Sequence, residues 1–292
     1  MKIKQNPLEK TADVIIYLLL FLICVITLYP MVYILSMSLS GPDAVLRQQV
    51  WLFPVGFSLG SYRLIMETHL FWQSYYNTLW YTTVGTLINL TLTLTAAYVL
   101  ASRTFFAGRF FMIMFVITMF FSGGLIPLFL QVNNLGLHGT RWAIVLPVAV
   151  STWNLIITRT FFRTSIPDGI LESAKIDGAN DILILLKIVL PVSTPIIAVL
   201  TIFYAVAHWN AWFSAAIFLH SADLHPLQLY LRRLLILGGG GVFQGDITVE
   251  LIAYIQQLRY SSIVVATLPI LCVYPFFQKY FVKGVMLGSI KE

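Results

Sequence analysis

Acidic side chains are the first candidates for chemistry in this sequence, and most of them stand alone. Of the 12 Asp and Glu residues, four fall close together between Asp168 and Asp181, and the rest are dispersed along the chain. A membrane-bound enzyme such as a glycosyltransferase or protease needs carboxylates, metal ligands or a nucleophile and its base at one place. The dispersed residues do not offer this, so we expect no catalytic residue. The group from Asp168 to Asp181 requires another explanation.

Metal and nucleotide binding are not indicated either. His220 and His225 form a lone pair of histidines, which is weak evidence for a metal site. Cys24 and Cys272 each lie inside a long apolar run, without a partner at metal-ligand spacing. The run Gly238 to Gly241 lacks the Lys-Ser/Thr of a phosphate loop, so we expect a flexible turn there. We therefore expect this chain to bind no metal, cofactor or nucleotide.

The amino-acid composition indicates whether the protein lies in water or in a membrane. Of the 292 residues, 59% are hydrophobic and only 10% are charged, whereas soluble domains carry about 25% charged residues. A water-soluble protein of this length could not bury so much apolar surface, so lipid must be part of the solvent. The net charge of +6 could indicate nucleic acid, but the basic residues are scattered between apolar runs. Membrane orientation explains them better, and we expect no nucleic-acid partner.

Six stretches without Asp, Glu, Lys or Arg are each long enough for a transmembrane helix, which needs about 20 apolar residues. Strands are excluded as spanning elements because the runs are continuous rather than alternating. The fourth stretch is short, so Arg159 must reach the interface for Phe161 and Phe162 to extend the helix. The sequence therefore predicts an all-α polytopic membrane protein. Its six predicted spans are Val14 to Pro42, Thr68 to Ser102, Phe110 to Thr140, Trp142 to Thr158, Ile188 to Ala222 and Tyr260 to Gln278.

The distribution of Lys and Arg predicts the orientation. With the N-terminus in the cytoplasm, the inner segments hold twelve of the 18 basic residues and the outer segments hold six. This excess fits the positive-inside rule with both termini cytoplasmic. The basic start could belong to a secretory signal, but the apolar run that follows is too long and no small-residue cleavage site follows Tyr29-Pro30. We expect it to be the first permanent span of a multi-pass plasma-membrane protein.

The longest inner loop, from Arg163 to Pro191, is also the most polar. Ser165 and Asp168 are spaced as a capping box, with Pro167 in the first turn. The pattern predicts a helix that runs to about Ile176.

A second helix follows in the same loop. Gly178 stops the first helix because glycine tolerates left-handed geometry. Asn180 is a good cap for a helix through Lys187, and Pro191 marks the junction with the fifth span. An amphipathic helix pair resting on lipid headgroups remains an alternative interpretation. The predicted apolar side consists of Leu171, Ala174, Ile182, Leu183 and Leu186.

This loop resembles the EAA loop of bacterial ABC importers. Glu172-Ser173-Ala174, then Gly178, then Ile188 and Leu190-Pro191 match the pattern E-A-A, three residues, G, nine residues, I-x-L-P. Ser173 departs from the usual alanine, but both are small. Asp177-Gly178-Ala179 is similar to the form found in sugar importers. The resemblance implies a coupling helix that inserts into a cleft of an ATPase subunit. The coupling residues it implies are Glu172, Ala174, Asp177, Gly178, Ala179, Ile188, Leu190 and Pro191.

The resemblance covers nearly the whole chain. Further matching segments include 121–127, 208–213 and 278–285. Together they resemble maltose-permease-like membrane subunits, most of all the branch assigned to complex oligosaccharides or polysaccharide fragments. The resemblance implies a single permease domain, 1–292, with the type I importer fold, in a bacterial plasma membrane. It also implies a second related permease, an extracytoplasmic sugar-binding protein, and two ATPase subunits that carry ATP and Mg.

A path for neutral sugars should be lined by aromatic faces and neutral hydrogen-bonding groups. Polar side chains in lipid-embedded helices tend to face the bundle interior. The tryptophans could instead form an interfacial belt, and Asn89 is better explained as hydrogen-bonding glue between helices. At most two of the consecutive residues His208, Trp209 and Asn210 can face one path. The candidates for the path are Trp153, Asn154, Tyr204, His208, Trp209, Asn210 and Trp212.

The main rival function is an ion-coupled secondary transporter. Such proteins usually place ionisable residues within their spans to carry the coupling ion. The six charge-free stretches contain no ionisable residues of this kind apart from histidines. This disfavours the rival and favours an importer whose energy comes from a partner subunit.

Overall fold

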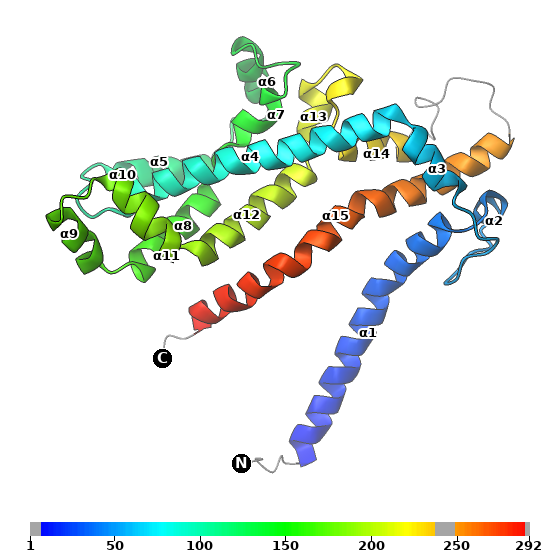
Figure 1. The fold of residues 1–292 in the computed structure, drawn as a ribbon, viewed down its shortest axis with the longest axis horizontal. Helices are drawn as coiled ribbons and strands as arrows, with labels where there is room; N and C mark the ends of the chain where they lie inside the picture. The colour runs from blue at the N-terminus through cyan, green and yellow to red at the C-terminus, as the bar shows by residue number, and fades with distance from the viewer. Residues whose placement is uncertain (1–6, 237–248, 290–292) are drawn as a thin grey trace. The chain divides into compact units, whose positions relative to one another are not determined.

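The computed structural model describes residues 7–236 and 249–289, and within these ranges all regular structure is helical (Figure 1). The all-α prediction is therefore confirmed for the described residues. The glycine turn expected at 238–241 lies outside these residues. The chain forms two compact units, one of residues 1–69 with 231–269 and the other of residues 70–230 with 270–292.

The first unit is built around the end of its long N-terminal helix. Gln257 donates a hydrogen bond from Nε2 to the Ser40 carbonyl at 2.6 Å, and the hydroxyls of Ser61 and Ser261 are 2.6 Å apart. None of the most apolar part of the first helix is buried in the protein, so this surface needs lipid or another chain. The elements of this unit are α1 (Pro7–Ser38), α2 (Pro42–Leu46), α3 (Gly60–Glu67) and the first part of α15 (Val249–Ser289).

The second unit is arranged along α4 (His69–Ala101), the long cyan helix in Figure 1. One apolar core, which includes Leu94, Leu155 and Leu200, lies toward the end of α4. A second core, which includes Tyr81 and Phe218, lies nearer its start. The other helices are α5 (Gly108–Phe120), α6 (Leu125–Asn134), α7 (Trp142–Val145), η1 (Leu146–Val148), α8 (Thr152–Ser165), α9 (Asp168–Ile176), α10 (Asp181–Ile184), η2 (Leu185–Val189), α11 (Leu190–Val192), α12 (Thr194–Trp209), α13 (Phe213–Phe218), η3 (Ala222–Leu224) and α14 (Leu227–Ile236), of which α14 continues into the first unit.

The helices match the predicted apolar stretches, but three of the stretches are bent. Within the described residues, two helices, Lys10–Ser38 and His69–Ala101, are long and apolar enough to cross a membrane. The number rises to five if each of three bent helix pairs forms one span. The count of six spans therefore stays a prediction.

The third predicted span, Phe110 to Thr140, is the clearest departure, because it is not one continuous helix. The chain turns by 118° between α5 and α6. Gly124 has a φ of 86° at this break, a left-handed conformation that glycine adopts at no steric cost. α5 has 13 residues, or about 20 Å of helix, which is too short to cross about 30 Å of hydrocarbon alone.

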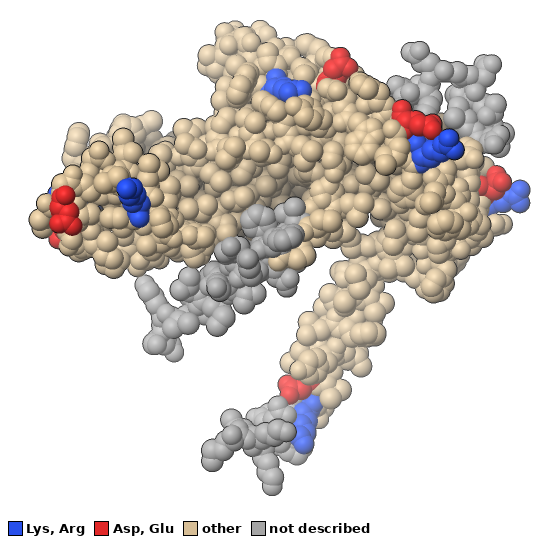
Figure 2. All heavy atoms as spheres, viewed as in Figure 1, with Lys and Arg blue, Asp and Glu red and all other residues tan. Residues whose placement is uncertain are grey.

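Charged side chains occupy little of the surface. On the face drawn in Figure 2, they form a few small groups, and the described surface between them is uncharged over long stretches. Many large apolar side chains are exposed, among them Phe21, Phe120 and Ile126 at 70–73%. Such continuous apolar surface fits a protein whose helices meet lipid or partner subunits.

Candidate functional site

The start of α9 differs from the prediction. Ser165 does not cap this helix, because it is the last residue of α8. Phe162 in the last turn of α8 is buried in the core, and the helix ends only at Ile166, which is extended and also buried. Pro167 occupies the N-cap position in an extended conformation and no side chain caps the helix. Asp168 instead forms an ion pair with Arg103, with 2.9 Å between Oδ2 and Nη2.

The end of α9 agrees with the prediction and has a complete Schellman motif. Gly178 has a φ of 81°. Its N–H donates to the Lys175 carbonyl at 3.1 Å, and the Ala179 N–H donates to the Ala174 carbonyl at 2.9 Å. These bonds satisfy carbonyls that a helix end leaves free. Ala174 is buried and Ala179 packs beside it in the same core, so the turn after Ile176 is fixed in place.

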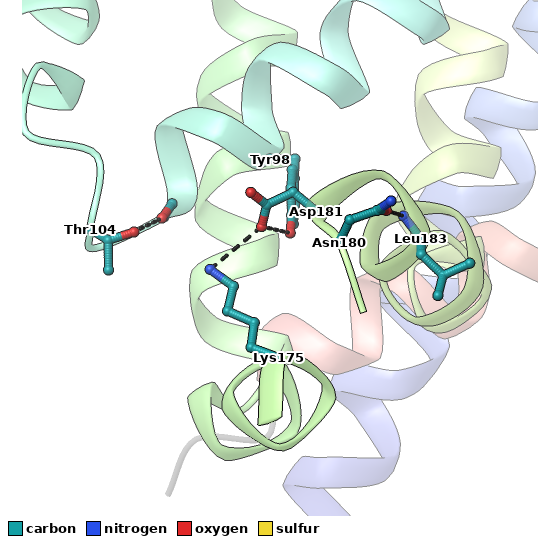
Figure 3. A network of polar contacts seen from close by, with 7 residues as sticks. Tyr98, Thr104, Lys175, Asn180, Asp181 and Leu183 are labelled. Carbon is teal, nitrogen blue, oxygen red and sulfur yellow. Dashed lines mark hydrogen bonds and ion pairs between the residues drawn. The ribbon is translucent and has the colours of Figure 1, made fainter. Parts of the chain in front are cut away.

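The next helix also starts as predicted. Asn180 caps α10, since its side chain accepts a hydrogen bond from the Leu183 N–H at 2.8 Å. Figure 3 shows Asp181 between Tyr98 of α4 and Lys175 of α9. Its Oδ1 atom lies 3.4 Å from each of the Tyr98 hydroxyl and the Lys175 Nζ. These contacts connect the two helices of the loop to the end of α4.

Pro191 does not mark the junction with the fifth span. Leu185–Val189 forms a π-helical turn, and Leu190–Val192 continues as helix. Proline has no N–H to donate, and a wider turn before it accommodates the missing bond. The bend of 85° comes after Val192, before α12 begins at Thr194. Ile188 and Leu190 pack against the core at this point.

The residues of this loop fall into two sets, one packed against the core and one exposed. Ala174 is buried, and Leu171, Ala179, Ile188 and Leu190 pack against the core. Glu172, Asp177, Gly178 and Pro191 are exposed, and the predicted apolar side is only partly correct, since Ile182, Leu183 and Leu186 are exposed. Ile176 is 86% exposed. We call the exposed set Ile170, Glu172, Ile176, Gly178, Ile182 and Leu186 the loop surface.

Two arginines hold this loop to α4. The Nε of Arg159 donates to the Leu100 carbonyl at 3.0 Å, and the Nε of Arg163 donates to the Ala101 carbonyl at 3.2 Å. These are the last carbonyls of α4, which have no partner within the helix. A cation at a helix C-terminus also interacts favourably with the helix dipole. The two side chains therefore fix the end of α8 against the end of α4.

A hydrogen-bonded polar group lies in the centre of the second unit. Asn89 is fully buried, and its Nδ2 donates to the carbonyls of Val148 and Ala149 at 2.7 and 2.9 Å. Its Oδ1 therefore faces His208, whose Nε2 lies 2.6 Å away and must carry the proton. The bonds join α4, η1 and α12, as expected for helix glue.

Gly85 makes this contact possible, and the sequence contained no signal for it. A Cβ built at Gly85 would meet the His208 ring, with Cε1 at 2.6 Å. The histidine therefore occupies the space that a side chain on α4 would fill.

Tyr204 and Asn154 are buried near the same place. The Tyr204 hydroxyl is 2.7 Å from the Thr93 hydroxyl and accepts a weak hydrogen bond from the Ser151 N–H at 3.4 Å. Asn154 is 6% exposed, in the first turn of α8. Both side chains lie between helices of this unit.

The other path candidates differ in exposure. Trp209 is buried, and its Nε1 has no hydrogen-bond partner among the described residues. Asn210 is exposed and donates to the Val206 carbonyl of its own helix at 3.0 Å. Trp153 is 57% exposed, and Trp212 packs partly against the core around Phe218. The structure therefore brings His208 and Tyr204 into the buried centre and leaves Trp153 and Asn210 outside it.

His220 contacts a third histidine, His138. His220 lies with its Nε2 3.1 Å from Nδ1 of His138, and His225 is buried elsewhere. No group of three or more His, Cys, Asp or Glu side chains suited to a metal occurs within the described residues.

Comparison with known proteins identifies the chain. It is 40% identical over 283 residues to the polygalacturonan/rhamnogalacturonan transport system permease protein YtcP of Bacillus subtilis, covering 96% of this chain and 98% of that protein. One chain of the crystal structure of a bacterial ABC transporter involved in the import of the acidic polysaccharide alginate superposes with a TM-score of 0.88 and 31% identity. The match covers 96% of this chain and all of that chain. The chain belongs to the sugar permeases of bacterial ABC transporters.

Another relative of this ABC sugar permease is protein LplC of Bacillus subtilis, which is 39% identical over 266 residues and covers 91% of this chain and 90% of LplC. No protein-family model matches the sequence. The family membership confirms the resemblance seen in the sequence. Permeases of this family are transport components and not enzymes, and membership does not favour a secondary transporter.

Proposed function

We propose that this permease pairs with a second, related permease to form the path by which an oligosaccharide or polysaccharide fragment enters a bacterial cell. Two ATPase subunits, which bind ATP and Mg, dock beneath the pair, and an extracytoplasmic sugar-binding protein delivers the substrate. The substrate class is supported by similarity to a polygalacturonan/rhamnogalacturonan permease and to an alginate importer. Alternating access follows when the ATPases close and move the loops of the two permeases.

The loop surface is the single feature that carries the coupling proposal. Ile176 and Ile182 are 86% and 70% exposed on a segment that is otherwise fixed by caps and core contacts. Exposed apolar side chains of this kind indicate contact with another molecule. Nothing lies within 4 Å of a Cβ built on Gly178, so a partner backbone can approach this turn closely. Glu172 supplies a charge at the rim, which favours an ATPase over lipid headgroups as the partner.

The substrate path is better supported for some candidates than for others. A path between two permeases must be lined by side chains that are exposed on each one. Trp153, Asn210 and the half-buried Trp212 meet this condition. Asn154, Tyr204, His208 and Trp209 are each at most 6% exposed, so they act on the path by positioning α8 and α12, unless these helices separate during transport.

The topology belongs to the same proposal. The permease forms one transmembrane domain with six spans and both termini in the cytoplasm, in the bacterial plasma membrane. The Lys/Arg distribution supports this orientation. A cysteine at Gly108 or Asp181 should resist a membrane-impermeant thiol reagent in intact cells, whereas one at Arg47, exposed in the outer segment after the first span, should react. The background is Cys24→Ser with Cys272→Ser. Labelling at Asp181 from outside would overturn the orientation and the coupling proposal together.

Gly178→Val is the sharpest test of coupling. The complex is isolated through a tag on this chain, and copurified ATPase and binding-protein-stimulated ATP hydrolysis are measured in proteoliposomes. We expect normal membrane abundance, with the ATPase absent or hydrolysing without transport. Gly169→Val is the matched control, because Gly169 lies in α9, in open space and without a positive φ, whereas Gly178 follows the end of that helix. Full coupling in Gly178→Val would show that the loop does not transmit the ATPase movement.

A further inference from the structure

A cavity of about 430 Å³ opens at the end of the second unit that carries the 163–191 loop. It lies between the connection from α4 to α5, the start of α5 and the last turns of α8. Four arginines line it, namely Arg103, Arg109, Arg159 and Arg163.

The arginines leave the cavity positively charged. Asp168 pairs with Arg103, but no carboxylate of the described residues lies within 4.0 Å of the other three guanidinium groups. Arg159 and Arg163 each use Nε on the carbonyls of α4. Arg109 makes no ion pair or hydrogen bond with any described residue through its side chain. The cavity therefore presents guanidinium N–H groups that remain available to an anion, with which they form strong charge-assisted hydrogen bonds.

The backbone at the cavity also favours an anion. Helix α5 begins at Gly108, and its N-cap residue Ala107 has no side chain that could cap the first amide groups. The N-terminus of a helix carries a partial positive charge and binds phosphate groups well. The start of α5 and Arg109 thus point to the same kind of ligand.

The rest of the cavity is apolar and follows the helix. Met112, Ile113 and Val116 line it, at three, four and seven residues after Arg109. This spacing places all four side chains on one face of α5. The stripe extends for about 10 Å along the helix. None of the residues of α5 is buried in the protein, and Ile113 in the middle of the stripe is 50% exposed.

We propose that this cavity binds an anionic phospholipid, with its phosphate between Arg109, Arg159 and Arg163 and an acyl chain along Met112, Ile113 and Val116. A soluble phosphate or an acidic peptide would satisfy the arginines but would leave the stripe uncovered. The inference rests on the orientation proposed above, in which this end of the second unit is cytoplasmic. The cytoplasmic leaflet carries anionic lipids, and basic pockets between helices on that side bind their headgroups.

The site would also touch the coupling loop. Arg103 lines the cavity and holds Asp168, the first residue of α9, at 2.9 Å. A phosphate held by the other three arginines adds negative charge to the cavity that this guanidinium also lines. We therefore expect a bound lipid to weaken the ion pair between Arg103 and Asp168, at the start of α9.

The test uses the complete importer, isolated through a tag on this chain, freed of lipid and titrated with phosphatidylglycerol in native mass spectrometry. Arg109→Gln should weaken binding by about tenfold or more, because a charge-assisted contact is lost. Arg109→Lys should recover much of the affinity. Lys10→Gln is the matched control, since it also removes one exposed cytoplasmic charge and lies outside the cavity. Ile113→Trp should weaken binding by filling the apolar part while all four arginines remain.

Three results would overturn the proposal. Equal binding in the natural protein and Arg109→Gln would show that the arginines hold no lipid. Phosphatidylcholine with the same acyl chains binding as tightly would reduce the site to an apolar groove, and glycerol 1-phosphate binding as tightly would make it a soluble phosphate site. Binding-protein-stimulated ATP hydrolysis, measured in the same preparations, shows separately whether the proposed transport function holds.

Discussion

Two regions of the second unit carry polar residues that stood out in the sequence. These residues are exposed in one region and buried in the other. In the 163–191 loop, Glu172 and Asp177 are exposed, and buried Ala174 and Ile184 fix the segment that carries them. Around Asn89 and the His208 ring, the polar groups are themselves buried and pair with one another. A polar residue in an apolar sequence thus signals a hydrogen bond that must be made. Exposure decides whether the partner is the same chain or another molecule.

The largest loss of stability is expected from Asn89→Leu, which would remove the central hydrogen bonds of the buried region. It would leave the His208 Nε2–H and the carbonyls of Val148 and Ala149 without partners, at a cost of about 3 kcal/mol or more in total. We expect little folded protein in detergent, measured by thermal unfolding with fluorescence-detected size exclusion. Asn210→Leu is the matched control, because Asn210 is exposed and bonds only within α12. If the two variants lose equal stability, Asn89 is not the joint between these helices.

Gly178→Ala tests how much the turn after α9 contributes to the stability of the loop. The positive φ of Gly178 should make a Cβ cost about 1–2 kcal/mol. Gly169→Ala makes the same chemical change in a helical conformation and should stabilise α9 by up to about 1 kcal/mol. Amide hydrogen exchange of residues 168–179 in the assembled complex measures both changes. Faster exchange in Gly169→Ala than in Gly178→Ala would contradict the Schellman turn.

Tyr204→Phe sharpens the comparison between buried and exposed path candidates. It removes the bond to the Thr93 hydroxyl and should cost about 1 kcal/mol of stability. Trp153→Ala should leave stability within about 0.5 kcal/mol, since the side chain is 57% exposed. Transport per assembled complex is then the deciding measurement. A loss in Trp153→Ala with none in Tyr204→Phe would assign the path to the exposed surface, and the reverse would assign it to the buried one.

Asp181→Asn should have the smallest effect. The Lys175–Asp181 pair is 3.4 Å long and both side chains are more than half exposed, so its loss should cost at most about 0.5 kcal/mol. Chemical denaturation of the complex at low and high salt measures this. A larger loss would mean that the bridge from α9 to α4 through Tyr98 is a main support of the loop.

Local signals in the sequence were sufficient for much of the loop. The end of α9 at Ile176, the positive φ of Gly178 and the cap by Asn180 depend only on neighbouring residues, and all three predictions are confirmed. The Ser165 cap was wrong because α8 runs to Ser165, with Phe162 of its last turn buried in the core. Tertiary packing of the preceding helix can thus override a local capping pattern.

The buried centre could not be predicted in the same way. Charge-free stretches located the helices, but the 118° break between α5 and α6 depends on a conformation that glycine permits without requiring it. The contact of Gly85 with His208 joins residues more than a hundred positions apart. Composition can therefore name polar residues within the membrane, but it cannot tell which of them face each other.

The two arginines at the end of α8 have a mechanical consequence. Arg159 and Arg163 grip the last carbonyls of α4, and only two residues separate Ser165 from the start of α9 at Asp168. A force applied at α9 is thus carried by two long helices at once, through hydrogen bonds to a charged group, which are among the strongest available. If an ATPase docks on this loop as proposed, its movement reaches both helices together, because these bonds hold the end of α8 to the end of α4.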